Sequence, residues 1–286
     1  MKIVQIDDVE RKRGLEHRGG TFHSRTMVEG TPGTPGNFKF SLSELGTDYS
    51  GPRHRHNFDQ FRFALEGESE YGQDGTLKAG MLGYYPEGIH YGPQVNKTPI
   101  VNVVLQFGGA SGSGYMSQEQ MEAGTAELKK QGTFEKGVFR RNESEAGKRN
   151  VDGYQAVWEN VSKRPMRYPE PRYNDPVMMN PGHFDWVPVG GMPGVYDKLM
   201  GVFTERRCAA QFFKLDPLAR FKGQGRAIYF VLSGAGQVAG EPYRQLTTIY
   251  CEDSDDPNFV ATSESEMLML GLPRLGKAIP HAVAAQ

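Results

Sequence analysis

Short apolar runs separated by glycine, proline and polar turns dominate residues 37–108. The runs are FKFSLSEL, QFRFALE, MLGYYP and IVNVVLQF, and each is followed by a turn-forming or polar segment. Runs of this length and spacing are typical of the strands of a β-sandwich or barrel. The run VNVVLQF is nearly continuous and rich in β-branched residues, which favours a buried strand. The pattern therefore predicts a β-domain over residues 37–112.

The strand pattern resumes at about residue 197 and continues towards the C-terminus. The segment AIYFVLSGAGQVAG parallels FRFALEGESEYG of the first half, and EMLMLGLP parallels VVLQFGG. Aligning the two halves on Gly234 and Gly67 places Phe221, Gly223 and Ala227 opposite positions 54, 56 and 60. This weak internal repeat predicts a second barrel over residues 197–286. A single barrel with an extended C-terminal sheet is the alternative.

The remaining segments have other patterns. Residues 1–36 are polar and glycine-rich and end in TPGTPG, which predicts an N-terminal arm with turns. Residues 113–196 are expected to form a linker. It holds a helix over 117–132, where Ser117 and Gln120 resemble a capping box, and a second helix over roughly 151–163. Residues 164–196 are proline-rich but also aromatic, which favours an ordered loop over a disordered one.

Composition excludes several classes of protein. With 37% hydrophobic and 23% charged residues, the chain of 286 residues is typical of a globular protein, and its 36 glycines and 18 prolines favour a turn-rich β-fold. A net charge of −1 gives no electrostatic indication of nucleic acid or anionic membrane. We find no signal peptide and no apolar run of about 18 residues, so we expect a cytoplasmic protein, with a homo-oligomer left open. Cys208 and Cys251 are expected to be reduced thiols, with a disulfide as the alternative.

Three of the seven histidines fall between residues 54 and 90. His54 and His56 are two residues apart, so in an extended segment their side chains point to the same side. His90 follows a Pro-x-Gly turn in the next apolar segment. Three imidazoles directed at one point predict a site for one divalent transition metal ion. The alternative is that all three are ordinary hydrogen-bonded polar residues.

These residues resemble the two sequence motifs of the cupin superfamily. The first motif is matched by His54, His56 and Gly67, with Gln60 where that family has glutamate, and Gly51 stands closer to His54 than the motif asks. The second is matched by Gly80, Pro86, Gly88 and His90, with Gln94 in place of asparagine. The resemblance implies a mostly β protein built from two cupin-type double-stranded β-helices, or jelly-roll barrels. It also implies a metal site in the N-terminal barrel, held by His54, His56, His90 and Gln60.

The residues beside these ligands indicate the charge of the substrate. Gln60 is a neutral donor, so a metal held by it and three histidines keeps its full charge and should favour an anionic, chelating substrate. Gln60 acting only as a hydrogen-bond donor outside the ligand set is the alternative. Arg62 shares the inward face and needs a carboxylate, which could come from the substrate or from Asp59, Glu68 or Glu70. Tyr91, like Tyr84 and Tyr85, could supply a phenolic donor near the metal or simply pack in the core.

The sequence thus predicts a metal-dependent enzyme that acts on a small anionic organic acid, with Gln60, Arg62 and Tyr91 near the reacting atoms. The resemblance favours a dioxygenase with Fe(II), while ligand type alone also allows Mn, Ni, Zn or Cu. A non-redox lyase, isomerase or decarboxylase is the second interpretation. A binding protein without turnover is the third. We find no nucleotide-binding loop, no nucleophile elbow and no paired CxxC motif.

Overall fold

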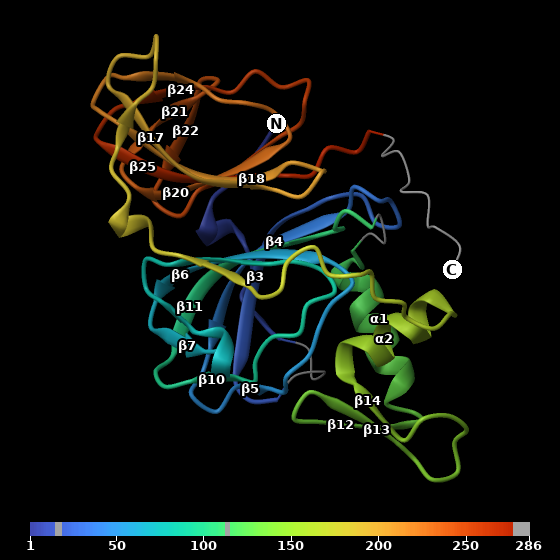
Figure 1. The fold of residues 1–286 in the computed structure, drawn as a ribbon. Coiled ribbons are helices and arrows are strands. Elements are labelled where there is room, and N and C mark those ends of the chain that lie inside the picture. Colours follow the sequence, from blue (N-terminus) through green and yellow to red (C-terminus); the bar gives the residue numbers. More distant parts are fainter. Residues whose placement is uncertain (15–18, 112–114, 277–286) are drawn as a thin grey trace, which may run out of the picture.

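The computed structural model describes residues 1–14, 19–111 and 115–276, which form two β-barrels (Figure 1). The N-terminal barrel consists of a seven-stranded and a four-stranded sheet. The larger sheet has the order β15 (Val177–Met179), β9 (Leu82–Tyr85), β6 (Asp59–Glu66), β11 (Ile100–Phe107), β4 (Phe38–Leu45), β3 (Phe22–Glu29), β2 (Lys12–Arg13). The smaller sheet has the order β5 (Ser50–Gly51), β10 (Gln94–Asn96), β7 (Glu68–Glu70), β8 (Thr76–Lys78).

The C-terminal barrel repeats this arrangement. Its seven-stranded sheet has the order β1 (Lys2–Val4), β23 (Thr248–Cys251), β20 (Ala227–Ser233), β25 (Ser265–Gly271), β18 (Cys208–Leu215), β17 (Val195–Phe203), β16 (Val187–Pro188). Its four-stranded sheet has the order β19 (Arg220–Lys222), β24 (Asn258–Ala261), β21 (Ala235–Val238), β22 (Glu241–Arg244). The prediction of a mostly β chain with two jelly-roll barrels is confirmed, and the single-barrel alternative is wrong.

Two short strands cross between the barrels. The N-terminal strand β1 pairs with β23 of the C-terminal barrel, and β15, which follows the linker helices, pairs with β9 of the N-terminal barrel. Residues 1–36 therefore do more than form an arm, since β3 pairs with β4 over nearly its whole length. A bulge between Thr26 and Val28 interrupts the alternation of β3, which explains why its sequence gives a weak strand signal.

The two seven-stranded sheets pack against each other through a shared apolar core. Three phenylalanine pairs join the barrels, with ring centroids 5.4–5.7 Å apart: Phe40 with Phe230, Phe61 with Phe203, and Phe63 with Phe212. Such pairs contribute roughly 0.5–1.5 kcal/mol each beyond the area they bury. Because side chains alternate along a strand, packing these residues on the outer face directs their neighbours into the barrel.

The interiors of the two barrels differ in chemistry. In the C-terminal barrel the inward side chains form an apolar core that includes Phe221, Tyr229 and Met269. In the N-terminal barrel the inward positions of β4, β6 and β11 are largely polar, and they surround a cavity. The functional site is therefore expected in the N-terminal barrel.

The segment predicted as a linker lies beside the N-terminal barrel (Figure 1), and its two helices contribute residues to the lining of the barrel's cavity. It contains α1 (Gln118–Leu128), α2 (Gly153–Ser162) and a small sheet of β12 (Gly132–Glu135), β13 (Val138–Arg141) and β14 (Asn150–Asp152). The capping box of Ser117 and Gln120 forms as predicted. Three short 3-10 helices complete the described elements: η1 (Ile6–Asp8), η2 (Gly72–Asp74) and η3 (Pro181–His183).

Two further expectations concern the whole chain. Cys208 and Cys251 are both buried and free, so the disulfide alternative is wrong. No helix within the described ranges is long and apolar enough to span a membrane.

Candidate functional site

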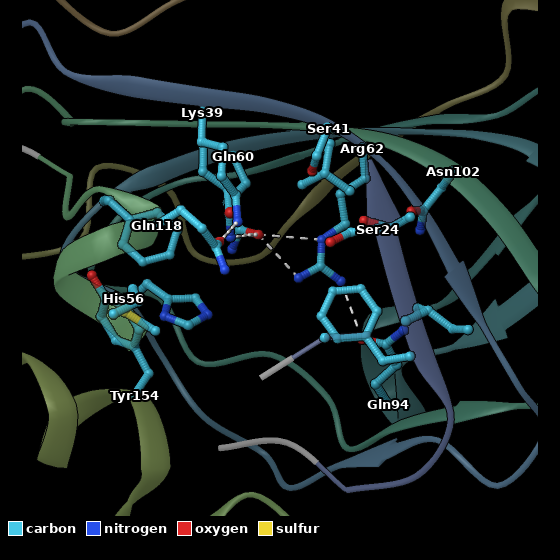
Figure 2. Close-up of a pocket in the computed structure, with 18 of the residues that line it drawn as sticks. Ser24, Lys39, Ser41, His56, Gln60, Arg62, Gln94, Asn102, Gln118 and Tyr154 are labelled. Atoms are coloured by element: carbon cyan, nitrogen blue, oxygen red, sulfur yellow. Dashed lines mark hydrogen bonds between the residues drawn. The ribbon is translucent and has the colours of Figure 1, made fainter. Parts of the chain in front are cut away.

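The candidate site is a cavity of about 120 Å³ inside the N-terminal barrel (Figure 2). Its polar lining comes from β3, β4, β6, β10 and β11, from the segment before β6 and from α1: Ser24, Lys39, Ser41, Ser43, His54, His56, Gln60, Arg62, Gln94, Asn102, Gln106, Gln118. None of the described lining residues is an aspartate or a glutamate. Two cationic side chains, Lys39 and Arg62, project into it. The described lining thus carries cationic side chains and no carboxylate, which favours an anion.

His54 and His56 meet in this cavity, as the sequence predicts. Both are buried, and their Nε2 atoms lie 3.1 Å apart. The Nδ1 of His54 lies 2.6 Å from the carbonyl oxygen of Pro52, which can only accept a hydrogen bond. Nδ1 of His54 must therefore carry a proton, and in the neutral ring its Nε2 keeps the lone pair. A bond of this kind from the remote ring nitrogen is common in metal-binding histidines.

His90 does not join this pair, which corrects the predicted three-histidine set. The His90 side chain is exposed, whereas that of the next residue, Tyr91, is buried. The backbones of His54 and Tyr91 bridge each other, and their ring centroids are 4.6 Å apart. The cupin motif has two residues between the glycine of the Pro-x-Gly turn and its histidine, so after Gly88 the histidine position falls on Tyr91. Because neighbouring side chains in extended backbone point to opposite sides, His90 then faces outward.

The residues present fit a metal ion only in part. With a metal–nitrogen distance of about 2.1 Å, two nitrogens 3.1 Å apart would subtend about 95° at a shared ion, which suits two adjacent ligands. Within residues 1–14, 19–111 and 115–276, however, no three His, Cys, Asp or Glu side chains are grouped so that they could hold a metal. The described chain thus offers two imidazole ligands and no third residue of these types.

Gln60 is held by protein partners on both sides of its amide. Its Oε1 accepts hydrogen bonds from Nη2 of Arg62 at 3.0 Å and from Nε2 of Gln106 at 3.3 Å. Its Nε2 donates to the hydroxyl of Tyr91 at 2.9 Å. The oxygen that would ligate a metal is therefore already shared by two donors. This arrangement supports the interpretation in which Gln60 lies outside a metal's ligand set.

Arg62 is surrounded by neutral groups. Besides Gln60, its guanidinium donates to the hydroxyl of Tyr71 at 2.8 Å, to Oε1 of Gln94 at 3.2 Å and to the hydroxyl of Tyr91 at 3.1 Å. It also lies 4.7 Å from the ring centroid of Tyr85, at a distance suited to a cation–π contact. Tyr85 and Tyr91, beside the second motif, thus orient Arg62 as well as packing in the core.

The structural salt bridges expected for Arg62 do not form. Asp59 lies on the other face of β6, where it accepts hydrogen bonds from the hydroxyl of Tyr84 and the backbone of Glu87. Glu70 pairs with Lys97 on the surface. Within the described ranges no carboxylate, that of Glu68 included, lies within ion-pair distance of Arg62.

Lys39 is a second cation that sequence reasoning missed. It projects from β4 into the cavity and donates a hydrogen bond from Nζ to Oε1 of Gln118 at 2.9 Å. Burial lowers the pKa of Lys39, and the carboxylates of Glu29 and Glu122 act in the opposite direction. A signal for it exists in the run FKFSLSEL. Once the phenylalanines are assigned to the outer core, the alternation places Lys39 and the following serines inside.

The insertion after β11 adds a further wall that the sequence does not reveal. Met121 of α1 and Tyr154 of α2 both line the cavity. The ring of Tyr154 meets that of His56 edge-on at a centroid distance of 5.1 Å, and the ring of Phe58 stacks on His56 at 4.3 Å. The rings of Phe58 and Tyr154 also contact each other, with centroids 5.1 Å apart, so the imidazole of His56 packs against an aromatic pair.

Comparisons with known proteins identify the fold. A scan against protein-family models finds no match, and a search of curated proteins finds none either. Solved structures do match. A candidate dioxygenase from Nostoc punctiforme aligns with a TM-score of 0.62 at 12% identity, covering 97% of this chain and 84% of that one.

Two other solved structures support the same conclusion. A variant of oxalate decarboxylase from Bacillus subtilis has a TM-score of 0.54 at 12% identity, covering 96% of this chain and 78% of its own. A candidate glyoxylate-induced protein from Pseudomonas aeruginosa has a TM-score of 0.55 at 9% identity, covering 91% and 84%. All three are cupin-family proteins. At these identities the likeness concerns the fold, and on that basis the chain has the cupin fold in its two-barrel form.

Proposed function

We propose that the N-terminal barrel binds a small organic acid whose carboxylate is held by Arg62. The observation that carries this proposal is the guanidinium itself, which lines a cavity whose described lining has no acidic residue. A cation removed from bulk water is costly unless a counter-charge accompanies it. Arginine presents paired N–H groups that match the two oxygens of a carboxylate. The ligand would supply the anion that the described protein residues do not.

The surroundings of Arg62 allow a ligand carboxylate to replace its present hydrogen-bond acceptors. Within the described residues, each hydrogen bond of its guanidinium goes to a neutral acceptor, and such bonds are weaker than those to a carboxylate. The rings of Tyr71, Tyr85 and Tyr91 keep the group in place while its hydrogen bonds change. The site is therefore preorganised for an anion, which reduces the entropy lost on binding.

For the chemistry, the proposal is an enzyme that uses a divalent metal on this acid, with an Fe(II) dioxygenase as the favoured reaction class. The fold is shared with proteins named as a candidate dioxygenase and an oxalate decarboxylase, which supports both this reaction and a non-redox decarboxylation. His54 and His56 would hold the ion through the two Nε2 atoms that lie 3.1 Å apart. A bound metal would supply Lewis acidity beside the carboxylate.

A second candidate is a binding protein without turnover. It is favoured by Tyr91, which stands where the motif places a third histidine, and by Gln60, whose oxygen is engaged by Arg62 and Gln106. Metal analysis of wild type and of His56→Ala tests the metal site on which the enzyme depends. We expect roughly one ion per wild-type chain and a marked loss in the variant. Equal metal content in both proteins would contradict binding at this pair. If the variant does lose its metal, oxygen consumption by wild type distinguishes oxygenase from decarboxylase chemistry.

The carboxylate site is tested by replacing Arg62 with methionine and measuring the affinity for a panel of small mono- and dicarboxylates by calorimetry. Hydrogen bonds to charged groups contribute roughly 1.5–3 kcal/mol each, so Arg62→Met should lose at least tenfold in affinity for every acid that the wild type binds. Arg140→Met is a matched control, because Arg140 is exposed and pairs with Glu135 on the small sheet. Wild-type affinity in Arg62→Met, or no binding of any acid by wild type, would refute the proposal.

A further inference from the structure

The cavity contains a second cationic side chain for which carboxylate recognition by Arg62 gives no role. Lys39 enters from β4, whereas Arg62 enters from β6, and β11 lies between these two strands. Figure 2 shows both side chains in the same pocket. From this pairing we infer that the ligand is a short dicarboxylate whose second carboxylate is bound by Lys39. The inference rests on the proposed function, since it assigns the first carboxylate to Arg62.

The strand register fixes the relation between the two cations. Lys39 is opposite Gln106 of β11, and Gln106 is opposite Gln60 of β6, two residues before Arg62. With strands about 4.8 Å apart and about 3.4 Å per residue along a strand, the Cα atoms of Lys39 and Arg62 are about 12 Å apart. Both side chains line the same cavity, with Nζ of Lys39 beside Gln118 and the guanidinium of Arg62 beside Gln60 and Gln94. A ligand that fills this cavity can therefore touch both cations.

The balance of charge in the cavity favours two negative groups. In the described ranges neither Lys39 nor Arg62 takes part in an ion pair, and the described lining has no acidic residue. Glu29 and Glu122 do affect Lys39, but both accept hydrogen bonds from Gln118 and neither lines the cavity. The space itself is thus bordered by two positive charges, and a dianion would match them.

The polar groups between the cations complete the recognition. Ser41 and Gln106 lie on the inward face between Lys39 and Arg62 and offer neutral hydrogen-bonding groups. Asn102, further along β11, is 1% exposed, and its Oδ1 has no hydrogen-bond partner within the part of the chain that the structure describes. This acceptor would suit a hydroxyl donor on the ligand. A volume of about 120 Å³ restricts the ligand to a short chain, because a cavity of about 150 Å³ holds benzene.

The experiment compares diacids with their own monoamides, which have nearly the same size but one charge less. Affinities for malonate, succinate and glutarate and for their monoamides are measured by calorimetry on the full chain at neutral pH. We expect wild type to bind the best diacid at least tenfold more tightly than its monoamide. Lys39→Met should reduce this preference to less than about threefold, while Lys39→Arg keeps the charge and should retain it. Lys97→Met is the matched control, since Lys97 is exposed and pairs with Glu70.

The outcomes separate this inference from the proposed function. If Lys39→Met keeps the wild-type preference, or if wild type binds the monoamide as tightly as the diacid, the role of Lys39 is refuted. In either case a loss of monoamide binding in Arg62→Met leaves the carboxylate site at Arg62 standing. If Arg62→Met changes neither affinity, the proposed function fails, and the inference fails with it. Thermal unfolding of each variant without ligand checks that the barrel remains folded.

Discussion

Replacing Asp59 with asparagine is expected to raise the free energy of unfolding above neutral pH. The variant's free energy of unfolding should also vary less with pH than that of wild type. Asp59 is 1% exposed and lies on the side of β6 that faces the C-terminal barrel. Burial, together with the nearby carboxylate of Glu87, raises the pKa of Asp59 to about 7. Asparagine keeps the shape and the acceptor for the Glu87 backbone N–H, which lies 2.7 Å from Oδ1, but removes the charge.

The sign and size of the effect follow from proton linkage. The reference pKa of an aspartate is 3.8, so between about pH 4 and pH 7 the folded protein keeps a proton that the unfolded chain has lost. Stability therefore falls as pH rises through this window, and the loss is complete above about pH 7. A shift of about three pKa units corresponds to about 4 kcal/mol at most, at 1.36 kcal/mol for each unit.

The assay is urea unfolding of wild type and Asp59→Asn at several pH values from 4.5 to 8.5. The free energy of unfolding of the variant, relative to wild type, should rise with pH across the window and level off above about pH 7. Asp185→Asn, at an exposed position on the C-terminal side of the linker, is the control and should show no such trend. A difference between Asp59→Asn and wild type that is the same at every pH would refute the assigned shift.

Two further predictions concern the core and the site. Phe230→Ala removes a fully buried ring between the barrels and should cost about 3–5 kcal/mol in urea unfolding; a loss below 1 kcal/mol would contradict the packing described for the two large sheets. Gln60→Glu replaces the amide whose oxygen accepts a hydrogen bond from Arg62 with a carboxylate, which should neutralise the charge of Arg62. One charge at ~4 Å is worth roughly 4 kcal/mol at a dielectric of about 20, and a quarter of that gives a roughly fivefold loss of anion affinity. Unchanged affinity in calorimetry would mean that charge at this position does not control binding.

The fold could be predicted from the sequence wherever local pattern and local structure coincide. The apolar runs of β4, β6 and β11, the capping box at Ser117 and the repeat around Gly234 and Gly67 were all recognisable. The strand exchange was not, because β1 pairs with residues almost 250 positions away and contains only three residues. A short strand that pairs at such a distance has no local signal, and the bulge in β3 removes the signal of a longer one.

The sequence predicts a site residue correctly only where it also shows which side of the strand that residue faces. His54 and His56 could be paired because their spacing of two residues keeps both on one side. His90 was assigned to the same side, although the structure turns Tyr91 inward and His90 outward. An error of one residue reverses the face, so a motif read one position early yields the wrong ligand. Lys39 was missed for a related reason. Its inward direction can be inferred only when the phenylalanines beside it are known to pack between the two barrels.

The two barrels have the same arrangement of sheets but differ in role: the C-terminal barrel contributes stability, and the N-terminal barrel carries the proposed binding site. Arg62 and Lys39 are partly buried and form no ion pair among the described residues. Their burial therefore destabilises the fold, and the cavity lining offers no compensating negative charge. The same strands that carry these cations, β6 and β4, bury Phe61, Phe63 and Phe40 against the C-terminal barrel. Since a slip of one residue would move the phenylalanines into the cavity and the cations into the apolar core, the interface fixes the register of the site. The C-terminal barrel, with its filled interior, thus stabilises the sheet from which the N-terminal barrel presents its charges.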